Sequence, residues 1–291
     1  MRPERGKKRP GRQRPKTPPS RHQQASGGAA ARVTGPKPPA GAHFLWGRHA
    51  VLAALANPER RVATIHATPE AAAELGDAIE RLPAARRAEL PPVSETDRRR
   101  LDAVHATADT DRAVHQGMMA AVWPLDAPDL DEFLAISGDG PVCLLLLDRL
   151  SDPRNIGAVL RSGLALGAQA VVTTHRNAPE ETGVLARAAA GALEHLPVIR
   201  VVNLARAIER LQQDGIMVAG LAAEGETTVS QLSEVERLGI VLGAEGTGLR
   251  HLTRQHCDRL VRIDISPQSE SLNVSVAGAI ALHAAARHRF R

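Results

Sequence analysis

An uninterrupted apolar run, Val142–Leu147, opens a series of strand-like segments that alternate with helix-like segments in the C-terminal half. Continuous apolar runs of this length are typical of strands buried on both faces of a parallel sheet. Strands that alternate with helices indicate an α/β fold. We therefore expect residues 141–291 to form a parallel α/β domain. Its further strands are expected at 170–173, 198–202, 216–221, 239–242 and 260–265, and its helices at 156–166, 180–193, 204–213, 249–256 and 272–287.

A smaller α/β unit is expected over residues 43–125, ahead of this domain. Its predicted helices cover 47–56, 69–82 and 97–104, and its predicted strands cover 61–67, 90–93 and 117–123. The segment 126–140 contains Pro128 and ends within the turn-forming sequence Asp139-Gly140-Pro141, so we interpret this segment as a linker.

Residues 1–42 carry 11 of the 37 Lys and Arg residues but only one of the 32 acidic residues. Their content of Pro, Gly and Ser leaves too little apolar surface to offset the entropy lost on ordering. We expect a disordered basic tail. It would act as a nucleic-acid-binding arm or, alternatively, as a tail that only increases solubility.

Composition narrows the function further. Aromatic residues make up 2% of the chain and Tyr is absent, so aromatic stacking cannot be the main device for holding RNA bases. The two cysteines, Cys143 and Cys257, are widely separated, which is typical of free thiols in a cytoplasmic protein. We expect no membrane segment and no metal site, since neither a long apolar run nor a clustered set of ligands is present.

Three short polar segments in apolar surroundings, here called polar islands, follow or flank predicted strands. Ligands of parallel sheets bind at the carboxyl ends of the strands. The first contains Asn155, Gly157 and Arg161. Asn155 could simply cap a helix. Gly157 and Arg161 are four residues apart and share one helix face, so the glycine could leave room for an anion such as an RNA phosphate to reach the guanidinium.

The second island is the loop Gly243-Ala244-Glu245-Gly246-Thr247-Gly248. Its glycine spacing differs from that of a dinucleotide-binding loop, and Glu245 would repel a pyrophosphate. An uncharged or cationic ligand fits better, and a flexible turn is the alternative. The third island is Ser271-Leu272-Asn273, whose polar side chains could also cap the last helix.

In this order, the three islands resemble the motifs of the SpoU-type RNA ribose 2'-O-methyltransferases of the SPOUT superfamily. The segment Phe44–Val51 resembles the opening of that family's substrate-binding domain, and His115-Gln116-Gly117 resembles its end. The resemblance implies a C-terminal domain with a deep trefoil knot, an exception to the rarity of knotted chains. It also implies a homodimer and the cofactor S-adenosyl-L-methionine, bound by backbone groups near Gly243, Ile263 and Leu272.

The resemblance further implies a catalytic pocket that consists of Asn155, Arg161, Glu245, Ser271 and Asn273. Arg161 would position the target phosphate and ribose, because its high pKa conflicts with a role as general base. The expected substrate is a guanosine of 23S rRNA, free or in a precursor of the large ribosomal subunit. Three alternatives stay open: a tRNA guanosine, an rRNA adenosine, or a catalytically silent RNA-binding assembly factor. A nucleotide-dependent oxidoreductase is disfavoured because the dinucleotide-binding loop is missing.

Overall fold

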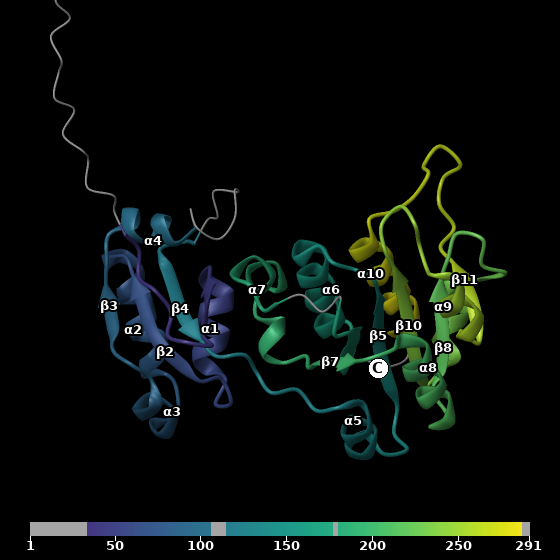
Figure 1. Ribbon diagram of the computed structural model, residues 1–291, viewed down its shortest axis with the longest axis horizontal. Helices are drawn as coiled ribbons and strands as arrows, with labels where there is room; N and C mark the ends of the chain where they lie inside the picture. Colours follow the sequence, from purple (N-terminus) through teal and green to yellow (C-terminus); the bar gives the residue numbers. More distant parts are fainter. Residues whose placement is uncertain (1–33, 106–114, 177–179, 287–291) are drawn as a thin grey trace, which may run out of the picture. The chain divides into compact units, whose positions relative to one another are not determined.

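The computed structural model describes residues 34–105, 115–176 and 180–286, which contain two separate sheets (Figure 1). Residues 1–33 lie outside the described part, so the predicted disorder of the basic tail stays a prediction for them. No helix in the described part is both long and apolar enough to span a membrane.

The N-terminal sheet has four strands in the order β1-β4-β2-β3, with β4 antiparallel to both neighbours. Its strands are β1 (His43–Trp46), β2 (Val62–Ala67), β3 (Val93–Glu95) and β4 (Met118–Val122). Its helices are α1 (Arg48–Ala56), α2 (Pro69–Glu80), α3 (Ala84–Glu89) and α4 (Arg98–His105). Strand β1 and helix α3 were not predicted from the sequence, and the other elements of this unit lie within a few residues of their predicted bounds.

The C-terminal sheet has seven strands in the order β7-β6-β5-β10-β8-β11-β9, and all of its pairings are parallel, as predicted. Its strands are β5 (Val142–Asp148), β6 (Ala170–Thr174), β7 (Val198–Val201), β8 (Met217–Leu221), β9 (Thr227–Thr228), β10 (Arg237–Gly243) and β11 (Arg259–Arg262). Its helices are α5 (Leu130–Ser137), α6 (Pro153–Ala165), α7 (Gly183–Ala189), η1 (Ala192–Glu194), α8 (Leu204–Gln213), η2 (Val229–Glu234), α9 (His251–His256) and α10 (Val274–Ala285).

Strand β5 separates two layers of helices, because successive side chains of a strand point to opposite faces. Leu145 and Leu147 join a core that includes residues of α6, α7 and α10, whereas Leu144 and Leu146 join one that includes residues of α8. Figure 1 shows α6 and α7 on one side of β5 and α8 beyond β10 on the other. Burial on both faces explains why this strand has no polar residue before Asp148.

Several helices begin or end at residues other than those predicted, and local hydrogen bonds and backbone conformations explain the differences. Helix α6 begins at Pro153 because the Asp152 side chain caps it, accepting from the amide of Arg154 at 2.9 Å. The helix expected over 180–193 divides into α7 and η1, because Ala190 and Gly191 both have positive φ values, 49° and 94°. The expected linker 126–140 contains α5, which begins with a capping box at Asp129.

Gly157 has a different role from the one expected. A Cβ atom at this position would lie 2.5 Å from Cβ of Ala188 and 2.6 Å from the carbonyl oxygen of Leu185. The glycine therefore allows α6 to pack closely on α7. Because α7 occupies this space, Gly157 does not open a path for an anion to reach Arg161.

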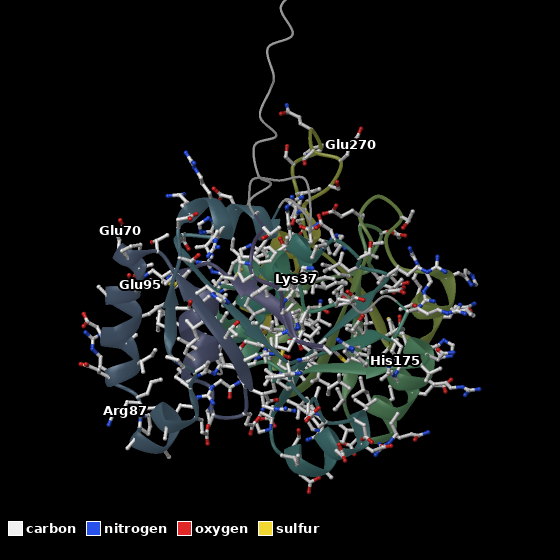
Figure 2. The ribbon with its side chains drawn as sticks, turned by 60° about the vertical axis from the view of Figure 1, so that its left-hand side comes forward. Lys37, Glu70, Arg87, Glu95, His175 and Glu270 are labelled. Carbon is white, nitrogen blue, oxygen red and sulfur yellow. The ribbon has the colours of Figure 1, made fainter. Side chains whose placement is uncertain are left out.

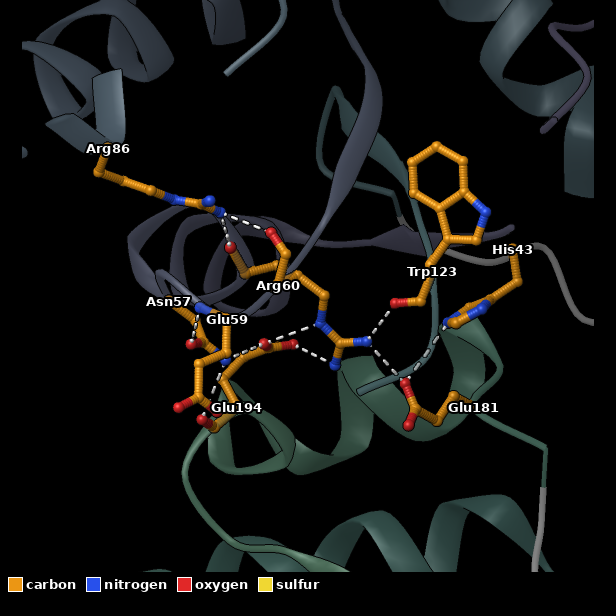
Figure 3. A network of polar contacts seen from close by, with 9 residues as sticks. His43, Asn57, Glu59, Arg60, Arg86, Trp123, Glu181 and Glu194 are labelled. Carbon is orange, nitrogen blue, oxygen red and sulfur yellow. Dashed lines mark hydrogen bonds and ion pairs between the residues drawn. The ribbon is translucent and has the colours of Figure 1, made fainter. Parts of the chain in front are cut away.

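A buried ionic network links segments that flank the strands of the N-terminal sheet to segments beside α7 and in η1 (Figure 3). Arg60, which precedes β2, is 0% exposed and donates from Nε and Nη2 to the two carboxylate oxygens of Glu194, at 2.9 and 2.8 Å. Its Nη1 donates to Glu181 at 2.8 Å and to the carbonyl oxygen of Trp123 at 2.9 Å. A buried guanidinium needs such partners, because desolvation of an unpaired charge is very costly.

His43 borders this network and makes stability depend on pH. Burial, followed by the positive charge of Arg60, lowers the pKa of His43 to about 4. The unfolded chain binds a proton near pH 6.5, so the stability that the neutral ring contributes is present above pH 6.5 and is lost as pH falls towards 4. Between pH 7.5 and 5, we expect the free energy of unfolding in urea to fall more for the wild type than for His43→Gln, by on the order of 1 kcal/mol after solvent screening. Parallel pH profiles would contradict this role.

Candidate active site

The three polar islands meet at the carboxyl edge of the C-terminal sheet. Asp148, the last residue of β5, pairs in register with Gly243, the last residue of β10. The third island lies in the segment between β11 and α10. Figure 2 shows Glu270 at the tip of this projecting segment, three residues before Asn273. The first two islands thus follow the ends of β5 and β10, whereas the third lies directly before α10, nine residues beyond the end of β11.

Asn155, Glu245 and Asn273 form one hydrogen-bonded cluster. Asn155 Nδ2 donates to Glu245 Oε1 at 2.7 Å, and Asn273 Nδ2 donates to the same oxygen at 3.0 Å. Asn273 Nδ2 also lies 3.0 Å from Asn155 Oδ1, which accepts from it. Side chains separated by 90 and 118 positions in the chain are therefore held within direct contact of one another.

Helix ends orient the two amides. Asp152 caps α6, so the Asn155 side chain lies in the first turn and is free to reach the cluster. The prediction that Asn155 might itself be the cap is wrong. Asn273 does cap α10, since its Oδ1 accepts from the Ser275 amide at 2.9 Å and from Ser275 Oγ at 2.5 Å. This fixes the amide orientation and turns Nδ2 towards Glu245 and Asn155.

The loop after β10 is a tight turn that presents Glu245. The amide of Gly248 donates to the carbonyl oxygen of Ala244 at 2.8 Å, which closes the turn. Gly246 and Gly248 have positive φ values of 77° and 64°, a conformation that glycine adopts at little cost. A Cβ atom on Gly243 would lie 2.3 Å from the carbonyl carbon of Gly248, so the two ends of the loop are nearly in contact.

Arg161 and Ser271 are not part of this cluster within the described chain. Arg161 is exposed and lines a hollow with residues of α1 such as His49 and Leu52. No hydrogen bond joins its guanidinium to another described residue. Ser271 lies two positions before Asn273, and its carbonyl oxygen accepts from Ser269 Oγ at 3.2 Å. Three of the five expected catalytic residues are therefore brought together.

The expected cofactor-binding residues lie on the segments around this cluster. Gly243 ends β10, Ile263 follows β11, and Leu272 directly precedes Asn273. Among the described residues, neither the amide nor the carbonyl group of Leu272 has a hydrogen-bond partner. These backbone groups are therefore available to a ligand.

Sequence reasoning missed the pair Asp148 and Arg250 beside the cluster. Asp148 is 1% exposed and accepts from the amide and from Nε of Arg250, at 2.9 and 2.5 Å. The signal in the sequence was a single carboxylate at the end of an apolar strand, since such a group must find donors when buried. The pair joins the end of β5 to the second residue after the glycine-rich loop.

Two family models match the chain. Residues 143–283 match the SpoU rRNA Methylase family, and residues 44–128 match the family described as RNA 2'-O ribose methyltransferase substrate binding. Apart from the first residue of β5 and of β1, these ranges contain the seven-stranded and the four-stranded sheet respectively.

Curated relatives agree with these matches. A 23S rRNA (guanosine-2'-O-)-methyltransferase of Escherichia coli K12 is 44% identical over 183 residues, covering 62% of this chain and 74% of the relative. The enzyme with the same description from Pseudomonas putida is 38% identical over 248 residues, covering 84% and 96%. An uncharacterized tRNA/rRNA methyltransferase of Synechocystis is also 38% identical over 84% of this chain, which spans 62% of that relative's length.

A solved structure supports the fold. The crystal structure of the SpoU methyltransferase AviRb from Streptomyces viridochromogenes, in complex with AdoMet, superposes with a TM-score of 0.67. The alignment covers 86% of this chain and 91% of that chain, at 23% sequence identity. At this identity the likeness concerns the arrangement of helices and strands.

Proposed function

The chain belongs to the SpoU rRNA methylase family, and from this we propose that it transfers a methyl group from S-adenosyl-L-methionine to a ribose 2'-hydroxyl of RNA. The family that the three motifs predicted is confirmed. The observation that carries the proposed reaction is the contact among Asn155, Glu245 and Asn273, because it gathers one side chain from each motif at one strand edge.

A guanosine of 23S rRNA is the proposed substrate. The relatives from E. coli and P. putida are described as enzymes of that specificity, and the second of them is matched over 96% of its length. A substrate-binding module of this family also precedes the methyltransferase segment. A tRNA guanosine is the second candidate, since the Synechocystis relative is described with both RNA classes.

The cluster can orient a ribose hydroxyl for attack. Glu245 keeps a carboxylate oxygen and Asn155 an amide group at the exposed carboxyl edge, where each can bond an incoming hydroxyl. Alignment of this hydroxyl with a methyl donor could contribute roughly 7–11 kcal/mol towards the barrier. We assign Arg161 and Ser271 to the same reaction, with Arg161 positioning the phosphate and ribose through its exposed guanidinium. The group that removes the hydroxyl proton is left unassigned.

The cofactor would be held by backbone groups of Gly243, Ile263 and Leu272. The unpaired amide and carbonyl group of Leu272 fit an adenine edge, which needs one donor and one acceptor. The described turn at Gly243 is too tight for a side chain, so a ligand there meets backbone alone. When bound, S-adenosyl-L-methionine supplies an electrophilic methyl group on a sulfonium.

The direct test uses purified protein, labelled S-adenosyl-L-methionine and one of two RNA substrates. These are unmodified 23S rRNA transcripts and assembly precursors of the large ribosomal subunit. Label is expected at one ribose, mapped by resistance of the 2'-O-methylated position to alkaline cleavage. Transfer to tRNA alone would select the second candidate. Absence of transfer to any stable RNA would overturn the proposed reaction.

Several further features are proposed for the same molecule. Its domains would comprise a basic RNA-binding tail (1–42), a substrate-binding domain (43–125), a linker (126–140) and a methyltransferase domain (141–291). Helix α10, which packs on α6, η2 and β10, would be the threaded part of a trefoil knot.

We also propose that α6 and α10 form the interface of a homodimer. Val276 and Ile280 expose 47% and 37% of their surface on α10. Ser162, Ala279 and their neighbours line a hollow on the same face, where small side chains permit close packing. Exposed apolar groups gathered on one face indicate a protein partner.

Ile280→Asp is expected to shift the protein from dimer to monomer, because the interface would bury an unpaired carboxylate. Light scattering coupled to size exclusion measures the mass. Ile136→Asp, on α5, is the matched control, since Ile136 is 82% exposed away from this face and its replacement should leave the mass unchanged. A monomeric wild type, or a dimeric Ile280→Asp protein, would contradict the assignment.

A further inference from the structure

A second polar cavity lies at the carboxyl edge of the C-terminal sheet, next to the active-site cluster. It has a volume of about 240 Å³ and is lined by residues that follow β5, β6 and β7 and by residues at the start of α9. Arg149, which lines it, directly follows Asp148, and Asp148 pairs in register with Gly243. The cavity therefore adjoins the glycine-rich loop without including Asn155, Glu245 or Asn273.

Three arginines give this cavity a positive charge. Arg149, Arg176 and Arg250 line it, and Asp148 neutralises only Arg250. Arg149 and Arg176 are exposed, and neither guanidinium has a hydrogen bond or ion pair with another described residue. Two guanidinium groups are thus free to bind an anion, and guanidinium geometry suits phosphate.

The backbone at Arg149 is held in an uncommon conformation. Its φ is 62°, in the left-handed region that non-glycine residues adopt at a cost of roughly 1–2 kcal/mol. Asp148 on one side is 1% exposed and Leu150 on the other is 3% exposed, so both neighbours are fixed in the core. The two buried neighbours therefore hold Arg149 at the surface in this strained conformation, and such strain is concentrated at functional sites.

Two aliphatic side chains border the same cavity in unusually exposed positions. Val202 is 88% exposed and Leu252 is 62% exposed, and both line the cavity with the arginines. Bases present flat apolar faces, which can pack on aliphatic as well as on aromatic groups. In a chain without tyrosine, these two side chains offer an apolar contact surface beside the phosphate-binding groups.

We propose that this cavity binds the single-stranded RNA segment next to the methylated nucleotide, with Arg149 and Arg176 on its phosphates and Val202 and Leu252 against a base. This inference rests on the proposed function and adds a substrate-positioning site to it. A cavity of this size, with positive charge at one strand edge, fits a backbone phosphate better than an entire folded duplex. The main role of Arg250 is to neutralise the buried carboxylate of Asp148.

The test compares Arg149→Gln, Arg176→Gln and the double variant with the wild type on unmodified 23S rRNA transcripts. The double variant should raise KM for RNA roughly tenfold and lower the slope of log affinity against log salt by about 1–2, because each lost phosphate contact removes about 0.7–0.9 from the slope. The affinity for S-adenosyl-L-methionine, measured by calorimetry without RNA, should be unchanged. Arg149→Lys should retain most of the affinity, because it keeps the charge on the same backbone.

Arg259→Gln is the matched control, since Arg259 is an exposed arginine at the opposite, amino end of β11. A double variant with the KM and salt slope of Arg259→Gln would overturn the inference. An equal loss of RNA affinity in Arg149→Gln, Arg176→Gln and Arg259→Gln would also overturn it, because a general effect of removing positive charge would then explain the data. If the wild type methylates no RNA, the proposed function fails, and that failure is visible before any variant is compared.

Discussion

Asn273→Ser is expected to lower the rate of methyl transfer by about 10²- to 10³-fold while leaving the fold intact. The amide of Asn273 donates to both Glu245 and Asn155, and removal of one preorganised donor from an active site costs about this factor. Serine keeps an oxygen that can cap α10, so the helix should lose only a few tenths of a kcal/mol. Single-turnover methylation of RNA measures the rate, and thermal unfolding measures the stability.

Asn273→Ala is the informative companion, because it removes both the donor and the cap. Its rate should equal that of Asn273→Ser, and its stability should be lower by about 1 kcal/mol. A serine variant with nearly wild-type turnover would show that Asn273 acts only as a helix cap. The proposed catalytic cluster would then be wrong at this residue.

Arg60→Met is expected to destabilise the protein by about 3–5 kcal/mol. The substitution leaves Glu181 and Glu194 without the guanidinium that pairs them, and their side chains are only 13% and 2% exposed. Loss of one partner from a buried ion pair costs this much, because the remaining charge is desolvated without compensation. Urea unfolding at neutral pH measures the change, and a loss under 1 kcal/mol would contradict the role of the network.

The triple variant Arg60→Met, Glu181→Leu, Glu194→Leu separates charge from packing. Replacement of a whole buried ionic group by apolar side chains of similar volume is often neutral or stabilising. The triple variant should therefore recover most of the stability lost in Arg60→Met. If it does not, shape at this contact matters more than the unpaired carboxylates.

The sequence predicted the elements whose signals are local. Helix α8 was predicted with its observed limits, because Asn203 caps it and apolar residues recur on one face. Strand β5 was predicted from its unbroken apolar run. In contrast, the division between α7 and η1 depends on the left-handed conformation of Ala190, which an alanine in the sequence does not predict. Strand β1 is only four residues long and owes its place to pairing with β4.

The site was predictable in part for the same reason. Asn155, Glu245 and Asn273 belong to recognisable motifs, and parallel strands bring their carboxyl ends to one edge. Arg161 belongs to the same motif as Asn155 but lies six residues along α6, outside the observed cluster. The partners of Arg60 lie 121 and 134 residues away, and an arginine before a strand ordinarily indicates a solvated charge. Ion pairs of this kind depend on tertiary contacts, which local sequence patterns do not predict.

The strand order has a consequence for how the chain reaches its native state. Strand β10 lies between β5 and β8, although both of these strands precede it in the chain. Until residues 237–243 insert, β5 and β8 each have an open hydrogen-bonding edge at the centre of the future sheet. Open apolar edges pair readily with other chains, and partly folded proteins aggregate through them. The insertion of one late strand therefore closes both of these central edges together.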